Sequence, residues 1–163
     1  MTSTARDLFV TGLRNAHAME HQAKELMERQ IERMSDYPAL QERLRLHLAE
    51  TEEQLTRIDT SLQELGESAS TLKDMALSLG ANIAALGHAI AGDEVLKNVF
   101  ANNAFENYEI AAYKSLIAIG DAAGTSASWM NQSLQEEERM ASWVADNVSA
   151  LTKRYLDLQA KPA

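Results

Sequence analysis

The 163 residues are enough for one domain with a substantial core, and 15 Lys and Arg against 24 Asp and Glu give a formal net charge of −9. This acidic balance, with no basic run, argues against nucleic acid as a partner. The chain has no cysteine, so we expect any metal to be held by oxygen or imidazole nitrogen. No uncharged run approaches the about 18 residues that a membrane span needs, which predicts a soluble, cytoplasmic protein without a membrane partner.

The composition predicts an all-α protein, because it contains only 2 Pro and 7 Gly. Apolar residues recur at steps of three and four in five segments, and Gly, Pro, Ser or Asp stands at the boundaries. These segments predict helices at about residues 4–34, 39–65, 71–91, 93–123 and 126–158.

The first two predicted helices form a tight hairpin, because capping residues and Pro38 interrupt the pattern for only a few positions. Glu20 lies in the middle of the apolar stripe of the first helix. On the second helix, His47, Glu50 and Gln54 share one flank of the apolar face. Both helices of this hairpin therefore bring polar side chains toward the core.

The segment 71–91 has an apolar stripe of its own and is rich in Ala and Gly. We interpret it as a helical crossover, because two antiparallel hairpins need a long connection between them.

The helix at 93–123 places a carboxylate inside its apolar stripe. Glu109 lies within about 40° of both Phe105 and Leu116 when 100° is counted per residue. Tyr113 lies close enough to the stripe to hydrogen-bond a ligand. A buried charge of this kind costs several kcal/mol unless it is paired, hydrogen-bonded or bound to metal.

The helix at 126–158 carries Glu137 near the centre of its apolar face. Its neighbours Glu136 and Glu138 lie about 100° to either side. We expect these two to be solvated or at the edge of the face, and we expect Trp129 and Trp143 to make core or dimer contacts.

Counting from the two turns places the four glutamates at one height. Glu20 and Glu50 are 16 and 14 residues from Asp36, whereas Glu109 and Glu137 are 15 and 13 from Gly124. In antiparallel pairs the mismatch within each hairpin is about 3 Å. Four core carboxylates at one level predict a two-metal carboxylate site for hard cations.

The sequence HAMEH at 17–21 also matches H-x-x-E-H, the inverted zinc-protease motif. His21 lies about 100° from the centre of the apolar stripe and no further ligand is evident. We therefore expect a solvated His21 and a His17 at the edge of the face.

Three segments resemble the YciE/YciF-type family of bacterial ferritin-like stress proteins. They are HLAETEEQLTRID (47–59), ENYEIAAYKSL (106–116) and SLQEEERM (133–140), with support from MEHQ (19–22). The resemblance covers nearly the whole chain and implies a ferritin-like four-helix bundle with an additional crossover helix, a homodimer and a di-iron-type site.

The resemblance carries the metal-ligand role to four positions and adds three residues close by. The four are Glu20, Glu50, Glu109 and Glu137, and the three are His47, Gln54 and Glu106. Iron or manganese is the implied cofactor, and oxidation or peroxide handling at the metals is the implied chemistry.

Two positions depart from the family pattern. Asn107 stands where histidine is common, and Ala141 stands where an acidic residue is frequent. The Glu-x-x-His pairs of di-iron bundles are absent too, since Glu50 is followed by Glu53 and Glu137 by Met140. A second hypothesis is therefore a non-enzymatic structural or interaction bundle that has lost full metal function.

Overall fold

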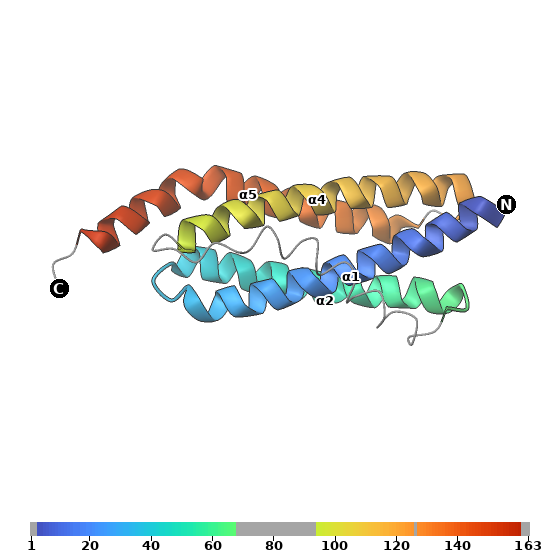
Figure 1. The fold of residues 1–163 in the computed structure, drawn as a ribbon, viewed down its shortest axis with the longest axis horizontal. Coiled ribbons are helices and arrows are strands. Elements are labelled where there is room, and N and C mark those ends of the chain that lie inside the picture. Colours follow the sequence, from blue (N-terminus) through green and yellow to red (C-terminus); the bar gives the residue numbers. More distant parts are fainter. Residues whose placement is uncertain (1–2, 68–93, 126, 161–163) are drawn as a thin grey trace.

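The computed structural model describes residues 3–67, 94–125 and 127–160. Within these residues the chain forms four long helices and no strand (Figure 1). The helices are α1 (Ser3–Arg33), α2 (Pro38–Glu64), α4 (Glu94–Ala123) and α5 (Ser128–Gln159). The all-α bundle predicted from the composition is confirmed, and the predicted helix at 71–91 lies outside the described residues.

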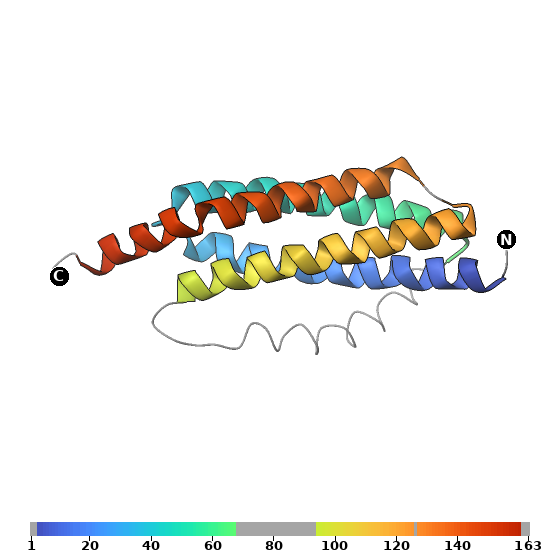
Figure 2. The same cartoon turned by 90° about the horizontal axis from the view of Figure 1, so that it is seen from above.

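The four helices form an antiparallel bundle. Helix α1 packs along α2 and α4, and α4 packs along α5, while α2 and α5 approach each other less. Helices α2 and α4 both run left to right in Figure 1, whereas α1 and α5 run in the opposite direction. Figure 2 shows the same arrangement from above, with α2 ending and α4 beginning at opposite ends of the bundle.

The turn between α1 and α2 is held by backbone contacts and not by a side-chain cap. Tyr37 precedes α2 and makes no side-chain cap hydrogen bond, and Pro38 occupies the first turn. The proline therefore lies where its missing N–H is not needed, but the side-chain cap expected from the capping residues before it is not seen, because the residue at the N-cap is Tyr37. Tyr37 is buried and contributes to the core.

Both α2 and α4 are followed within two residues by a glycine with positive φ, at +80° for Gly66 and +67° for Gly124. Glu67 N donates to Leu62 O at 3.0 Å, and Thr125 N donates to Gly120 O at 2.9 Å. These are the six-to-one hydrogen bonds of a Schellman motif, which satisfies carbonyls that the helix end leaves free. Two helices thus stop in the same way at the same end of the bundle (Figure 1).

One hydrophobic core runs through the bundle, and it is interrupted by polar side chains at mid-height. Leucines and methionines such as Leu13, Leu44 and Met130 are fully buried above and below this level. Trp129 and Trp143 are partly buried and pack against the same core. The apolar layers on either side exclude water from the polar level, which strengthens electrostatic interactions there.

Candidate metal centre

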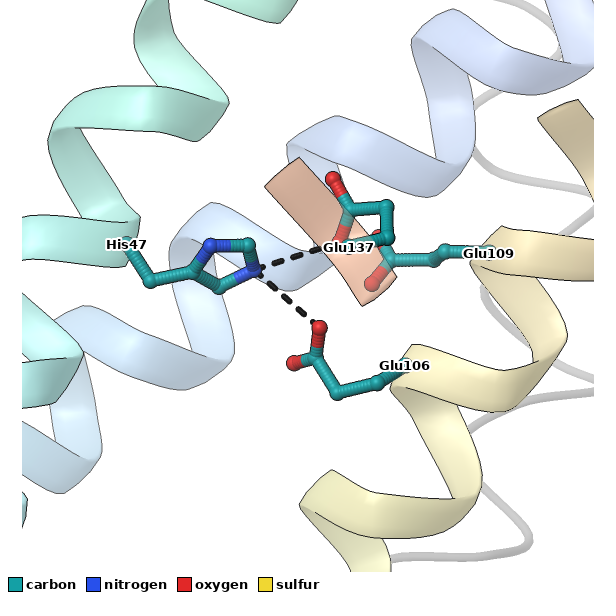
Figure 3. A group of neighbouring side chains, drawn as sticks. All are labelled: His47, Glu106, Glu109 and Glu137. Atoms are coloured by element: carbon teal, nitrogen blue, oxygen red, sulfur yellow. Dashed lines mark ion pairs between the residues drawn. The ribbon is translucent and has the colours of Figure 1, made fainter. Parts of the chain in front are cut away.

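Three helices bring four potential metal ligands together at mid-height. Helix α2 supplies His47, α4 supplies Glu106 and Glu109, and α5 supplies Glu137 (Figure 3). One ligand atom from each residue lies within 4.8 Å of every other, and all four residues are buried. Figure 3 shows their side chains pointing toward one another from three helices, with Glu106 and Glu109 both on α4.

The helical repeat explains why two ligands come from α4. Glu106 and Glu109 are three residues apart, so their side chains leave the same face of the helix. Their neighbours on that face are Phe105, Tyr113 and Leu116, all of which are buried. The apolar stripe of α4 thus carries the two carboxylates into the core.

His47 connects the centre to its surroundings through both ring nitrogens. Its Nε2 lies 3.2 Å from Glu106 Oε2 and 3.2 Å from Glu137 Oε2. Its Nδ1 lies 2.9 Å from Glu50 Oε2 on the opposite side of the ring. A carboxylate behind a histidine fixes the ring and its tautomer, so Glu50 aims Nε2 at the centre.

Glu50 is therefore not among the four grouped ligands. Its side chain is 23% exposed, and Arg139 donates to its second oxygen at 3.1 Å. Partial burial raises the pKa of Glu50, but the hydrogen bonds to His47 and Arg139 outweigh it and lower the pKa below its ordinary value. The sequence-predicted ligand Glu50 thus lies one residue away from the centre, behind His47.

Glu20 from α1 lies at the edge of the group. It is fully buried, and Tyr113 donates to its Oε1 at 2.6 Å. Burial raises the pKa of Glu20 well above its ordinary value, and the nearby charge of Glu137 adds to that effect. Glu20 thus lies near Glu137 at this level, whereas α2 contributes His47 to the group and not the predicted Glu50.

The donor set fits a metal, because buried carboxylate oxygens lack hydrogen-bond donors. In the described part of the chain, five such oxygens have none: Glu20 Oε2, Glu106 Oε2, Glu109 Oε1, Glu109 Oε2 and Glu137 Oε2. Two of them, Glu106 Oε2 and Glu137 Oε2, each lie 3.2 Å from His47 Nε2, which can pair with them when the ring is protonated. Oxygens in this state favour a hard cation, which takes carboxylate ligands.

The protonation of the centre without metal reflects this crowding. Burial raises the pKa of Glu109 well above its ordinary value, and the charges of Glu137 and Glu20 add to it. Burial likewise raises the pKa of Glu106 to about 7. For His47, burial lowers the pKa, but the carboxylates of Glu106, Glu137 and Glu50 outweigh it and raise the pKa well above 6.5. Protons thus take the place of cations in the metal-free protein.

Glu136 corrects an expectation from the sequence. It is only 4% exposed, although its angle on α5 predicted a solvated or edge position. Arg57 from α2 makes two hydrogen bonds to it, Nη1 to Oε2 at 2.7 Å and Nη2 to Oε1 at 3.1 Å. The counter-charge comes from a different helix, so the periodicity of α5 alone could not show it. Glu138 is exposed, as predicted.

Gln54 lies between the two adjacent glutamates of α5. It is fully buried, and its Nε2 donates to Glu136 Oε2 at 3.0 Å and also to Glu137 Oε1. Sequence reasoning placed Gln54 near the centre but missed Glu136 and Arg57. The position of Arg57 three residues after Gln54 on the same helix is the signal that could have found them.

The inverted zinc-protease motif does not converge on a metal. His17 Nε2 lies 3.2 Å from Asp59 Oδ1, while Glu20 turns to Tyr113. His21 is exposed as predicted, whereas His17 is buried and not at an edge. Among the described residues these side chains belong to no group of three convergent ligands.

Asn107, which stands where histidine is common in the family, does not point into the centre. Its side chain is exposed, and its Nδ2 donates to Asn103 O at 2.7 Å. Ala141 is buried one turn after Glu137, so an acidic ligand is missing at a position that faces the core. Of these two positions, only Ala141 faces the core.

Comparisons with known proteins agree with the fold. Residues 4–157 match the family described as a domain of unknown function, DUF892. A protein from Xanthomonas campestris pv. campestris is similar with a TM-score of 0.79 and 29% identity, over 96% of this chain and 99% of that one. YcfI from Rhodopseudomonas palustris is similar with a TM-score of 0.66 and 24% identity, over 86% of this chain and 92% of that one.

Among the described helices, none combines the length and apolar character that crossing a bilayer requires. The family match spans nearly the whole chain, and the bundle agrees with the solved relatives. The chain therefore belongs to the DUF892 family, the YciE/YciF-type family of ferritin-like proteins.

Proposed function

We propose that this protein binds a pair of iron or manganese ions between His47, Glu106, Glu109 and Glu137, with Glu20 at the edge. The observation that carries the proposal is the set of five buried carboxylate oxygens that have no hydrogen-bond donor. Leaving such groups unpaired costs free energy, and hard divalent cations offset that cost.

Charge supports a pair of ions over a single one. Four buried carboxylates, those of Glu20, Glu106, Glu109 and Glu137, balance two divalent cations when His47 is neutral. Glu136 does not enter this balance, because Arg57 already neutralises it. A single divalent cation would leave two carboxylates that must take up protons or remain charged in the core.

The proposed activity is oxidation or peroxide handling in a stress response, as the family resemblance implies. Bound iron or manganese would supply electron transfer to oxygen or peroxide. The chain's own residues exclude water, hold His47 through Glu50 and place a phenol, that of Tyr113, against Glu20. The resemblance also supports a homodimer, which a sedimentation profile would detect as twice the mass of one chain.

Metal analysis after anaerobic loading tests the proposal. Wild-type protein loaded with Fe²⁺ or Mn²⁺ and then desalted should retain about two ions per chain. Glu109→Gln should retain fewer, because it replaces a carboxylate at the centre of the group with a neutral amide. Glu138→Gln is the matched control, since it removes the same charge from an exposed position on α5 and should bind as wild type. Wild-type protein that retains no stoichiometric metal would refute the proposal.

A structural bundle without metal chemistry is the second candidate. Two observations favour it: Ala141 stands where a further acidic residue would face the core, and His47 already pairs with two carboxylates. This candidate predicts that ferrous iron is oxidised no faster with the protein than in buffer.

A further inference from the structure

Beside the candidate metal centre lies a second polar group, made by the buried Gln54 and Glu136 and the partly buried Arg57. Both oxygens of Glu136 accept hydrogen bonds from the Arg57 guanidinium, at 2.7 and 3.1 Å. Arg57 Nη1 also donates to Ser133 Oγ at 3.1 Å, one turn before Glu137 on α5. A two-pronged Arg–carboxylate pair has a fixed geometry, so it sets the position of α2 relative to α5 at this level.

The carboxylate of Glu136, which Arg57 holds in place, and that of Glu137 determine which way the amide of Gln54 faces. The two N–H bonds of an amide are its only donors, and here both point at carboxylates, those of Glu136 and Glu137. If the amide turned over, its oxygen would face two carboxylates and be repelled. Gln54 is fully buried, so water cannot replace the lost donors.

The orientation of the Gln54 amide affects the candidate ligand Glu137. Gln54 occupies Glu137 Oε1, which leaves Glu137 Oε2 without a donor and 3.2 Å from His47 Nε2. One oxygen of the carboxylate is thereby held in place while the other faces the centre.

We propose that Arg57, Glu136 and Gln54 form a strut that positions Glu137 for metal binding. The three are positioning residues, because none of them belongs to the grouped ligands. The strut rests on the proposed function, since it orients a ligand of the proposed centre. Partners of this kind change metal affinity by about 10- to 100-fold when they are removed.

The absorption spectrum of bound Co²⁺ distinguishes residues that position a metal ligand from residues that only stabilise the fold. Co²⁺ replaces iron or manganese at oxygen and nitrogen ligands, and its visible absorption reports the geometry of those ligands. Gln54→Leu removes the donor to Glu137 without adding charge. We expect about 10- to 100-fold weaker Co²⁺ binding, measured by competition with a chelator, and a changed Co²⁺ spectrum.

Gln132→Leu is the matched control. Gln132 Nε2 donates to Glu136 Oε1 at 3.1 Å from the exposed side, and it does not touch Glu137. This variant removes one hydrogen bond to the same carboxylate, yet it should keep the wild-type affinity and spectrum. Equal losses of Co²⁺ affinity in both variants would overturn the strut. Metal binding would then depend on any hydrogen bond to Glu136, and not on the one that Gln54 donates to Glu137.

Arg57→Lys is the second variant, in case Gln54→Leu does not fold. It keeps the positive charge but cannot donate to both oxygens of Glu136 in one plane. We expect a shifted Co²⁺ spectrum and a smaller loss of affinity at unchanged helicity. A wild-type spectrum and affinity in folded Gln54→Leu or Arg57→Lys would overturn the strut and leave metal binding in place. Wild-type protein that binds no Co²⁺ would overturn the proposed function as well, so the two failures are distinguishable.

Discussion

At the scale of residues, the centre brings together carboxylates whose negative charges repel one another when no metal is bound. Glu109 has two buried oxygens without a donor, and Glu137 and Glu20 are close enough to raise its pKa beyond the effect of burial. His47 is the one basic side chain among the four grouped ligands. The charge that could satisfy the remaining oxygens must come from protons or from cations.

The metal-free protein should therefore lose stability as the pH rises from 4.5 to about 7. Glu106 has a higher pKa in the folded than in the unfolded chain, so its stabilising contribution is complete below 4.5 and is lost as the pH passes about 7. The raised pKa values of Glu109, Glu20 and His47 act in the same direction. The expected loss is on the order of a few kcal/mol.

Thermal unfolding of chelator-treated protein across this pH range measures the effect. Glu109→Gln should flatten the profile, because a neutral amide replaces one of the titrating groups. A melting temperature that rises over the same range would contradict the raised pKa values.

Residue positions were predictable where one helix decides them and not where two helices do. The apolar stripe on α4 was enough to predict a buried Glu109. The choice between His47 and Glu50 depends on how far α2 is rotated about its axis, and packing against other helices sets that rotation. About 60° separates the two positions in the predicted pattern, which is less than one residue step.

At the scale of elements, the described helix ends lie within two residues of their predicted positions. Gly66 and Gly124 explain this for α2 and α4, because both adopt the left-handed conformation that ends a helix. The level of the polar layer was predictable for a related reason. Each hairpin turn lies at a recognisable position in the sequence, so counting residues from it fixes the height of every side chain.

Gly66→Ala and Gly124→Ala should each destabilise the fold by about 1 kcal/mol. A side chain at either position would meet no neighbour within 4 Å, so the cost comes from the positive φ alone. Asparagine tolerates this conformation better, and the corresponding Asn variants should lose less. Urea unfolding of the four variants gives the comparison, and Asn variants as unstable as the Ala variants would argue against backbone strain as the cause.

At the scale of the whole molecule, metal should stabilise the bundle, because the ligands come from separate helices. A metal at 100 times its dissociation constant adds about 2.7 kcal/mol to the free energy of unfolding. For a chain of this length that corresponds to about 5 to 10 °C in melting temperature. Melting curves with Mn²⁺ and with chelator measure it, and identical curves would favour the structural candidate over the metal-binding one.

The distribution of the ligands along the chain also orders events during synthesis. His47 and Glu137 are 90 residues apart in sequence, and Glu106 and Glu109 lie between them. A ribosome-bound chain that has released only the first hairpin displays one of the four grouped ligands, the imidazole of His47, and none of the three grouped carboxylates. Assembly of the full ligand set must wait until the part of α5 that carries Glu137 has left the exit tunnel, so binding by all four ligands cannot guide the early folding of the first hairpin.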